Sequence, residues 1–435
     1  MTVKDKEPND GVIEIEEIRK QKSKNGSVKA NRMIKKFNSI KNDKKTPISP
    51  KILIIGIVLI LIVVYLITDI STGGIISTVN GKFVSVLTKN ASADFSVNTD
   101  AENVYGFSPY GSGYVILTEN GISYVDSDGA VSSRQQLTYS LPSMEIMGKS
   151  ILVFDRGNTS YSLIKNKSLY SQMSTEKSII DAAISKRDNY AIAVRDENAK
   201  SILYGYSSSG KIIYQWNCPD GYIADIAINK SGSKVAVTVI NSENAVLSSK
   251  IYILDFEYDS AYAEFEYNSE IVIGSKFITN RKLQIVTDKN VYTISSKTQN
   301  VAYSYDSAEI CYTSVSQGNC TAVIINEHTH DNYYTLLFFS KSGKLKYTVP
   351  LNGKVLDVSA SDKSVSVLFD SKTETYSSTG KLVGMTENIN YNNRLVLNSN
   401  YLFVLSSDSV KRFASYGVTS AVYEYEEESN QGGNL

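Results

Sequence analysis

One uncharged apolar run separates a short, lysine-rich head from a long body in which short apolar segments alternate with polar turns. The run covers residues 52–68 and, with its neighbours, can cross a hydrocarbon core of about 30 Å as a helix that rises about 1.5 Å per residue. We therefore predict a transmembrane helix over residues 51–70. A cleaved signal peptide is the alternative, but it needs a short leader and an apolar core of about 7–15 residues.

The charge on either side of the run predicts its orientation. Residues 1–51 contain fourteen Lys and Arg against seven Asp and Glu, and the rest of the chain contains 31 basic and 38 acidic residues. Because short loops rich in Lys and Arg stay on the cytoplasmic side, we expect a plasma-membrane protein that spans once, with the head inside and the body outside. The body has no excess of basic residues that would indicate nucleic-acid binding.

The head, residues 1–50, has the basic and polar composition of a mostly disordered segment. Within it, residues 12–18 alternate Ile and Val with Glu. This segment either docks on a cytosolic partner or forms part of a solvated acidic tail.

The body, residues 94–417, repeats. Eight times a short apolar strand, a tight polar turn and a second apolar strand recur, at a spacing near 40 residues. The second strands begin near Tyr114, Ile151, Tyr190, Val235, Leu283, Thr321, Val365 and Leu402. This period predicts an all-β fold, an eight-bladed β-propeller with four-stranded antiparallel blades. Tandem sandwich domains are the rival, but they repeat nearer 100 residues.

The last repeat predicts how the ring closes. Residues 393–417 supply only three strands, so we expect residues 94–98 to add the fourth. Closure of this kind leaves no long exposed sheet edge. Residues 71–93 are then a linker, and residues 418–435 an acidic tail. A glycine ends the turn before the fourth strand in four repeats, where a hairpin needs a positive φ; these are Gly129, Gly210, Gly343 and Gly380.

Several stretches carry a family resemblance. They are Val-Tyr-Gly-Phe at 104–107, Ile-Leu-Thr-Glu-Asn-Gly-Ile-Ser-Tyr-Val at 116–125 and Leu-Val-Phe-Asp-Arg-Gly at 152–157. The chain resembles an uncharacterised family of bacterial single-pass membrane propellers, a domain of unknown function within the WD40-like and quinoprotein-like superfamily. Residues 227–237, Ala-Ile-Asn-Lys-Ser-Gly-Ser-Lys-Val-Ala-Val, resemble a generic propeller hairpin. The resemblance implies an anchored propeller and supplies no chemistry.

Known propeller chemistries find little support. Quinoprotein dehydrogenases need several tryptophans, whereas this chain has only Trp216. It also lacks a Gly-x-Ser-x-Gly elbow and a glycine-rich phosphate loop. We therefore expect no cofactor and no nucleophilic catalysis. Cys311 and Cys320 lie about four residues out of register in the expected hairpin, so we predict that they and Cys218 are unpaired, buried thiols.

The two histidines are weak metal candidates. His328 and His330 are two residues apart, so an extended segment would point both to one side, beside two carboxylates. Such a set can bind zinc. The same residues also suit an ordinary solvated loop, and we predict no metal.

Carboxylates near the propeller axis are the main candidate site. Asp181, Asp225 and Asp357 occur early in the innermost strand of three repeats, and we place Glu145 similarly. They could ring one mouth of the channel and hold a cation, a basic peptide or a sugar. Asp155 and Arg156, in a turn expected on the same face, add a possible anion contact. The alternative is that the aspartates bond local backbone groups at strand starts.

These observations favour a membrane-anchored, non-enzymatic binding or scaffolding module at the cell envelope, with an envelope protein or glycan as its partner. Two alternatives stay open. One is a carbohydrate-active or lyase-type enzyme that uses two of the carboxylates as acid and base. The other is a transmembrane sensor whose head docks a cytoplasmic partner.

Overall fold

The computed structural model describes residues 96–98 and 103–420, apart from 197–199, 244, 316–319, 328–331, 388, 390–391, 399–400 and 408. The predicted head, transmembrane helix and linker, the tail beyond residue 420, and both histidines lie outside the described residues. No helix in the described part is long and apolar enough to cross a membrane.

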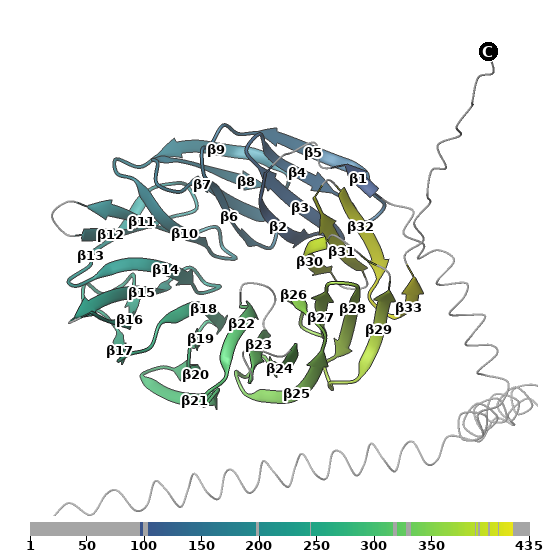
Figure 1. Cartoon of the computed structure of the whole chain (residues 1–435). Coiled ribbons are helices and arrows are strands. Elements are labelled where there is room, and N and C mark those ends of the chain that lie inside the picture. Colours follow the sequence, from purple (N-terminus) through teal and green to yellow (C-terminus); the bar gives the residue numbers. More distant parts are fainter. Residues whose placement is uncertain are drawn as a thin grey trace, which may run out of the picture. The chain divides into compact units, whose positions relative to one another are not determined.

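Eight sheets follow one another around a ring, as Figure 1 shows, and we number these blades in chain order. Blade 1 contains β2 (Val104–Tyr110), β3 (Gly113–Thr118), β4 (Gly121–Val125) and β5 (Val131–Gln136). Blade 2 contains β6 (Pro142–Met147), β7 (Ser150–Asp155), β8 (Ser160–Lys165) and β9 (Ser168–Ser174). Blade 3 contains β10 (Ile179–Ile184), β11 (Tyr190–Asp196), β12 (Lys200–Tyr206) and β13 (Ile212–Asn217). Blade 4 contains β14 (Tyr222–Ile228), β15 (Lys234–Glu243), β16 (Val246–Asp255) and β17 (Ala263–Tyr267).

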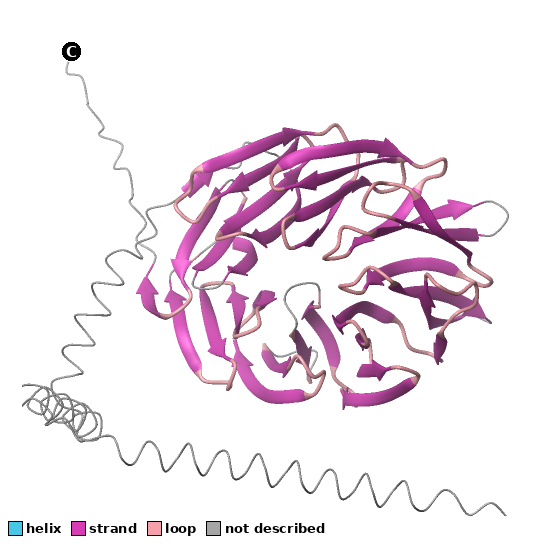
Figure 2. Ribbon diagram, turned by 180° about the vertical axis from the view of Figure 1, so that it is seen from behind, coloured by secondary structure: helices cyan, strands magenta, loops and turns pink. Residues whose placement is uncertain are grey.

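The second half of the ring continues the pattern. Blade 5 contains β18 (Val272–Thr279), β19 (Lys282–Thr287), β20 (Asn290–Ser295) and β21 (Thr298–Ser304). Blade 6 contains β22 (Glu309–Ser314), β23 (Thr321–Asn326), β24 (Tyr333–Phe339) and β25 (Leu345–Asn352). Blade 7 contains β26 (Val355–Ala360), β27 (Ser364–Phe369), β28 (Lys372–Ser377) and β29 (Leu382–Glu387). Blade 8 contains β30 (Asn392–Asn398), β31 (Tyr401–Ser406) and β32 (Ser409–Ala414). The eight-bladed fold is confirmed, and every described element in Figure 2 is a strand or a loop.

The two ends of the propeller join it in different ways. Strand β1 (Ser96–Asn98) pairs antiparallel with β32 and completes blade 8, which confirms the predicted closure. Strand β33 (Gly417–Ser420) pairs in parallel with β29 and gives blade 7 a fifth strand. This second connection was not foreseen in the sequence.

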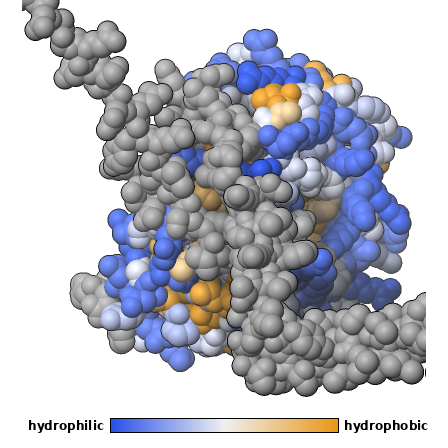
Figure 3. All heavy atoms as spheres, turned by 90° about the vertical axis from the view of Figure 1, so that its right-hand side faces the viewer, coloured by the Kyte–Doolittle hydropathy of each residue, from blue (hydrophilic) through white to orange (hydrophobic). Residues whose placement is uncertain are grey.

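The core lies between the blades. The two middle strands of each blade are largely buried because neighbouring sheets cover both faces, whereas outer strands such as β13 alternate exposed and buried residues. Figure 3 shows the consequence on one side of the molecule, where small apolar patches lie on a mostly hydrophilic described surface.

The turn glycines have the predicted conformation. Gly129, Gly210, Gly343 and Gly380 have φ values of 98°, 86°, 78° and 78°. In each of these turns the glycine N–H donates to the carbonyl of the residue three positions earlier. The cysteine prediction is right about pairing, since all three thiols are free. It is wrong about burial at Cys311, which is exposed because a β-bulge in β22 skips this residue in the pairing with β23.

Candidate functional site

A β-bulge near the start of the innermost strand recurs in every blade except blade 2. A bulge adds one unpaired residue and changes the direction of the side chains that follow. Asp181, Asp225 and Asp357 are the residues directly after three of these bulges. The structure therefore gives the three aspartates equivalent positions around the channel.

Each of these aspartates reaches the next blade. One carboxylate oxygen of Asp181 accepts a hydrogen bond from the backbone N–H of Ile226, at 3.0 Å. Asp357 likewise accepts a 2.8 Å bond from the N–H of Leu395. Asp225 accepts a 2.9 Å bond from the hydroxyl of Ser275. The three carboxylates thus link blade 3 to 4, blade 4 to 5 and blade 7 to 8.

Glu145 lies at a different level. Strand β6 has no bulge, and Glu145 pairs with Leu152, the second residue of the apolar segment in β7 that begins at Ile151. The equivalent register in blade 5 belongs to Lys276, which pairs with Gln284. We predicted that Glu145 is placed like the aspartates, but the strand register gives it a different position. Its counterpart is a lysine in another blade.

Electrostatics couples these groups across the channel. Glu145 is exposed to the channel, but it lines a cavity with residues of blades 3 to 6, and these blades limit the water around it. Burial, followed by the negative charges of Asp181 and Asp225, raises its pKa to about 8. Burial also lowers the pKa of Lys276 to about 8, although the charge of Glu145 opposes this shift. Burial raises the pKa of Asp357 to about 6 and raises the pKa values of Asp181 and Asp225.

Asp155 and Arg156 make structural contacts. The Asp155 carboxylate accepts hydrogen bonds from the backbone N–H groups of Ser140 and Leu141, at 3.1 and 2.8 Å, and is buried. The Arg156 guanidinium pairs with Asp181 at 3.1 Å. This pair holds the turn between β7 and β8 against blade 3. The expected anion contact is thus occupied by a carboxylate of the same chain.

Two cavities lie along the channel. Glu145, Asp225 and Lys276 line one of about 270 Å³. The other, of about 460 Å³, is lined by Lys186, Lys230 and Lys276 together with Glu145. We call this second cavity the lysine mouth.

The lysine mouth was missed in the sequence although a signal exists. Lys186 and Lys230 both occupy the turn between the first and second strands of their blades, in consecutive repeats. Aligning these turns would have placed both side chains at one end of the channel. Tyr110 and Asn398, from blades 1 and 8, line the same cavity.

Carboxylates are the acidic groups that line the smaller cavity. In the part of the chain that the structure describes, no three His, Cys, Asp or Glu residues form a group that could hold a metal ion. His328 and His330 fall outside it, so the zinc hypothesis is untested. Asp225 is the second carboxylate beside Glu145 in the smaller cavity, and Ser275 already bonds it.

A family model matches residues 87–420. The chain belongs to a family of unknown function, DUF5711. No curated protein matches it significantly.

Three solved structures are similar to the chain at low sequence identity. BamB from Moraxella catarrhalis is similar at 11% identity with a TM-score of 0.46, covering 73% of this chain and 96% of BamB. A structure of the eukaryotic initiation factor has 13% identity and a TM-score of 0.49, covering 75% of this chain and 88% of the other. The C-terminal WD40 domain of Sif2 has 14% identity and a TM-score of 0.49, covering 74% and 95%.

Proposed function

We propose that this protein is a non-enzymatic binding module that holds an anionic segment of a partner protein at the lysine mouth. The observation that carries the proposal is the convergence of Lys186, Lys230 and Lys276, from three consecutive blades, on one cavity. Opposite charges at a recognition site speed encounter and suppress wrong partners. Glu145 is the one carboxylate among the described residues that line the mouth.

The rest of the lining suits a polypeptide. Met144, Met147 and Phe277 give the mouth an apolar wall, and methionine adapts its shape to varied ligands. The Tyr110 and Asn398 side chains add polar groups on the opposite side of the ring. A segment that alternates acidic and apolar residues would match this combination. The aspartates serve the links between blades, which favours binding over acid–base catalysis.

The proposal also includes a membrane anchor over residues 52–68, with the propeller outside the cell. The support is the apolar run and the excess of basic residues before it. Protease added to intact spheroplasts should then degrade the propeller and leave a small membrane-bound fragment. A propeller that survives until the membrane is opened would place it on the inner side.

Binding can be tested with a fluorescein-labelled hexaglutamate peptide and the full-length protein, followed by fluorescence anisotropy. The double variant Lys186→Gln, Lys230→Gln should weaken binding several-fold, and added salt should weaken binding to the unchanged protein. The matched control is Lys211→Gln, Lys381→Gln, which removes two exposed lysines from turns before outer strands. Equal weakening in both doubles would mean that only net charge matters, and would overturn the mouth as the site.

A further inference from the structure

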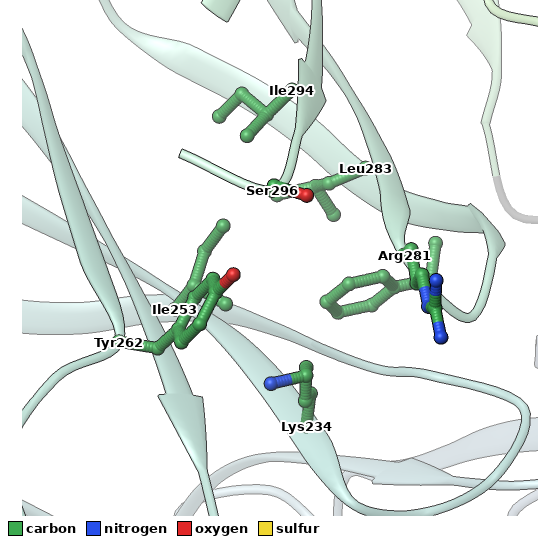
Figure 4. Close-up of a pocket in the computed structure, with 8 residues that line it drawn as sticks. Lys234, Ile253, Tyr262, Arg281, Leu283, Ile294 and Ser296 are labelled. Atoms are coloured by element: carbon green, nitrogen blue, oxygen red, sulfur yellow. The ribbon is translucent and has the colours of Figure 1, made fainter. Parts of the chain in front are cut away.

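A third cavity lies between blades 4 and 5, away from the channel axis. Its volume is about 300 Å³, at the lower end of the range for small-molecule sites, about 300–1,000 Å³. The buried side chains of Ile253, Phe277, Leu283 and Ile294 form its walls. In Figure 4, Tyr262, Lys234 and Arg281 surround the same space from three sides, with Leu283, Ile294 and Ser296 on the fourth. We call it the inter-blade pocket.

Two aliphatic side chains line the pocket at positions where blade 3 has tyrosines. In blade 3, Tyr190 pairs with Tyr206 across β11 and β12, and their rings stack 4.8 Å apart against blade 2. The equivalent pair in blade 5 is Leu283 with Ile294. The two pairs are equivalent by register. Tyr190 lies three positions before Ala193, which pairs with the first residue after the bulge in β10. Leu283 lies three positions before Val286, which has the same place opposite β18. Aliphatic side chains here leave open the space that two tyrosines fill in blade 3.

The rim of the pocket is cationic. Arg281 lies in the turn between β18 and β19 and is exposed. Its guanidinium has no hydrogen bond or ion pair to any residue in the described part of the chain. A guanidinium presents donors in a fork that matches a carboxylate, so Arg281 can bind one in a bidentate manner.

The other rim charges are partly neutralised. Lys234 pairs with Asp255 and lies 4.1 Å above the Tyr262 ring. Lys297 approaches the same ring at 5.1 Å. Two lysines and one arginine against one aspartate leave this end of the pocket positive. An apolar interior with a positive rim selects a ligand with an apolar body and a negative end.

We propose that the inter-blade pocket binds a small amphipathic carboxylic acid, with its hydrocarbon part between blades 4 and 5 and its carboxylate on Arg281. This site is separate from the proposed partner site. The linings of the inter-blade pocket and the lysine mouth have a single residue in common, Phe277. The proposal therefore adds a second ligand class and does not depend on the first.

The test uses octanoate and the full-length protein with ¹³C-labelled isoleucine methyl groups. Ile253 and Ile294 line the pocket, so their methyl signals should shift and saturate as octanoate is added. Octanol, which lacks the charge, should bind several-fold more weakly. These local signals also distinguish binding in the pocket from binding to detergent or to the lysine mouth.

Two variants separate the effect of filling the pocket from the effect of removing the charge of Arg281. Leu283→Tyr places one of the blade 3 tyrosines in blade 5 and should abolish the octanoate shifts at Ile253 and Ile294. Arg281→Gln changes an exposed side chain without altering the walls, and should weaken octanoate binding several-fold while octanol binding stays the same. Arg187→Gln, in the corresponding turn of blade 3, is the matched control and should change nothing.

The results that would overturn the proposal are equally specific. Unmoved Ile253 and Ile294 signals at saturating octanoate would show that the pocket takes no such ligand. Equal affinity for octanoate and octanol, or an Arg281→Gln variant that binds like the Arg187→Gln control, would remove the carboxylate from the proposal. Hexaglutamate binding should be unchanged in Leu283→Tyr, so failure at one site is distinguishable from failure at the other.

Discussion

The carboxylate of Asp357 in blade 7 accepts a 2.8 Å hydrogen bond from the backbone N–H of Leu395 in blade 8. Leu395 directly follows the post-bulge residue of its own strand, Arg394. Ile226, which donates to Asp181, has the same place after Asp225. The bulge and the aspartate thus work together: one shifts the innermost strand, and the other accepts an N–H of the strand beside it. This contact adds to other polar links between successive sheets, such as the 3.1 Å bond from the Leu397 N–H to the Ser359 hydroxyl.

Replacing Asp357 by alanine should lower the free energy of unfolding by about 1–3 kcal/mol, because the Leu395 N–H loses its acceptor within the protein. Asp357→Asn should cost less, since an amide oxygen can still accept. Urea unfolding followed by circular dichroism measures both. Asp370→Ala, at an exposed aspartate of the same blade, is the control. Equal stability of the Asp357→Ala and Asp370→Ala variants would show that the bond between blades contributes nothing.

Ring closure by β1 predicts a second loss of stability. Ser96 and Asn98 pair with Lys411 and Ser409, so a chain that begins at residue 101 lacks the outer strand of blade 8 and exposes the edge of β32. Its thermal unfolding midpoint should be lower than that of a chain beginning at residue 75. A third chain beginning at residue 94 keeps β1 and should match the longer one. Equal midpoints for all three would contradict closure.

The fold was largely predictable because its determinants are local. A blade recurs about every 40 residues, and each turn glycine sits at a fixed distance before the last strand. Closure followed from counting, since the last repeat was one strand short. Strand β33 was not predicted, because its pairing with β29 is parallel and its sequence, Gly417–Ser420, resembles any short polar segment.

The site was less predictable because it depends on register between blades. Bulges cannot be predicted from the alternation of apolar and polar residues alone, so Glu145 looked equivalent to Asp181. In the structure Glu145 pairs with a position of the second strand that is two residues earlier than the one that pairs with Asp181. The acceptors and donors of the inter-blade bonds are some 40 residues apart in sequence. The lysine mouth combines turns from separate repeats, and the inter-blade pocket is lined by Leu283 and Ile294 where blade 3 has two tyrosines. The effect of these differences between blades can be recognised only when the blades are superposed.

The parallel pairing of β33 depends on the absence of a side chain at Gly384. A Cβ atom there would lie 2.3 Å from the backbone oxygen of Ser415, so that backbone would have to move. Gly384→Ala should therefore detach β33 and make the chain after residue 415 more sensitive to limited proteolysis, measured by mass spectrometry. Gly274→Ala is the control, because its new Cβ would meet Val315 at an ordinary 3.6 Å. The same cleavage rate in both variants would show that residues 415–417 adjust freely.

Glu145 should make the stability of the propeller depend on pH in a defined direction. Its pKa rises from 4.5 to about 8 on folding, because of burial and then the charges of Asp181 and Asp225. The folded protein therefore binds more protons than the unfolded chain in this window. The contribution of Glu145 to stability is fully present below about pH 4.5 and is lost as the pH rises towards about 8. The raised pKa values of Asp181, Asp225 and Asp357 act in the same direction.

Two substitutions isolate the contribution of Glu145. Glu145→Gln removes the titrating group, so the loss of stability between about pH 5 and about pH 8 should be smaller than in the unchanged protein. Lys276, whose pKa in the folded protein is about 8, stays mostly protonated in both states below about pH 7, so it does not mask the effect there. Lys276→Gln removes a cation that lowers the pKa of Glu145, as Arg156 also does, and should therefore steepen the loss. Urea midpoints across this pH range measure all three proteins. If the Glu145→Gln and unchanged proteins lose stability in parallel, the pKa of Glu145 is the same in the folded and unfolded protein, and the channel does not destabilise its charged form.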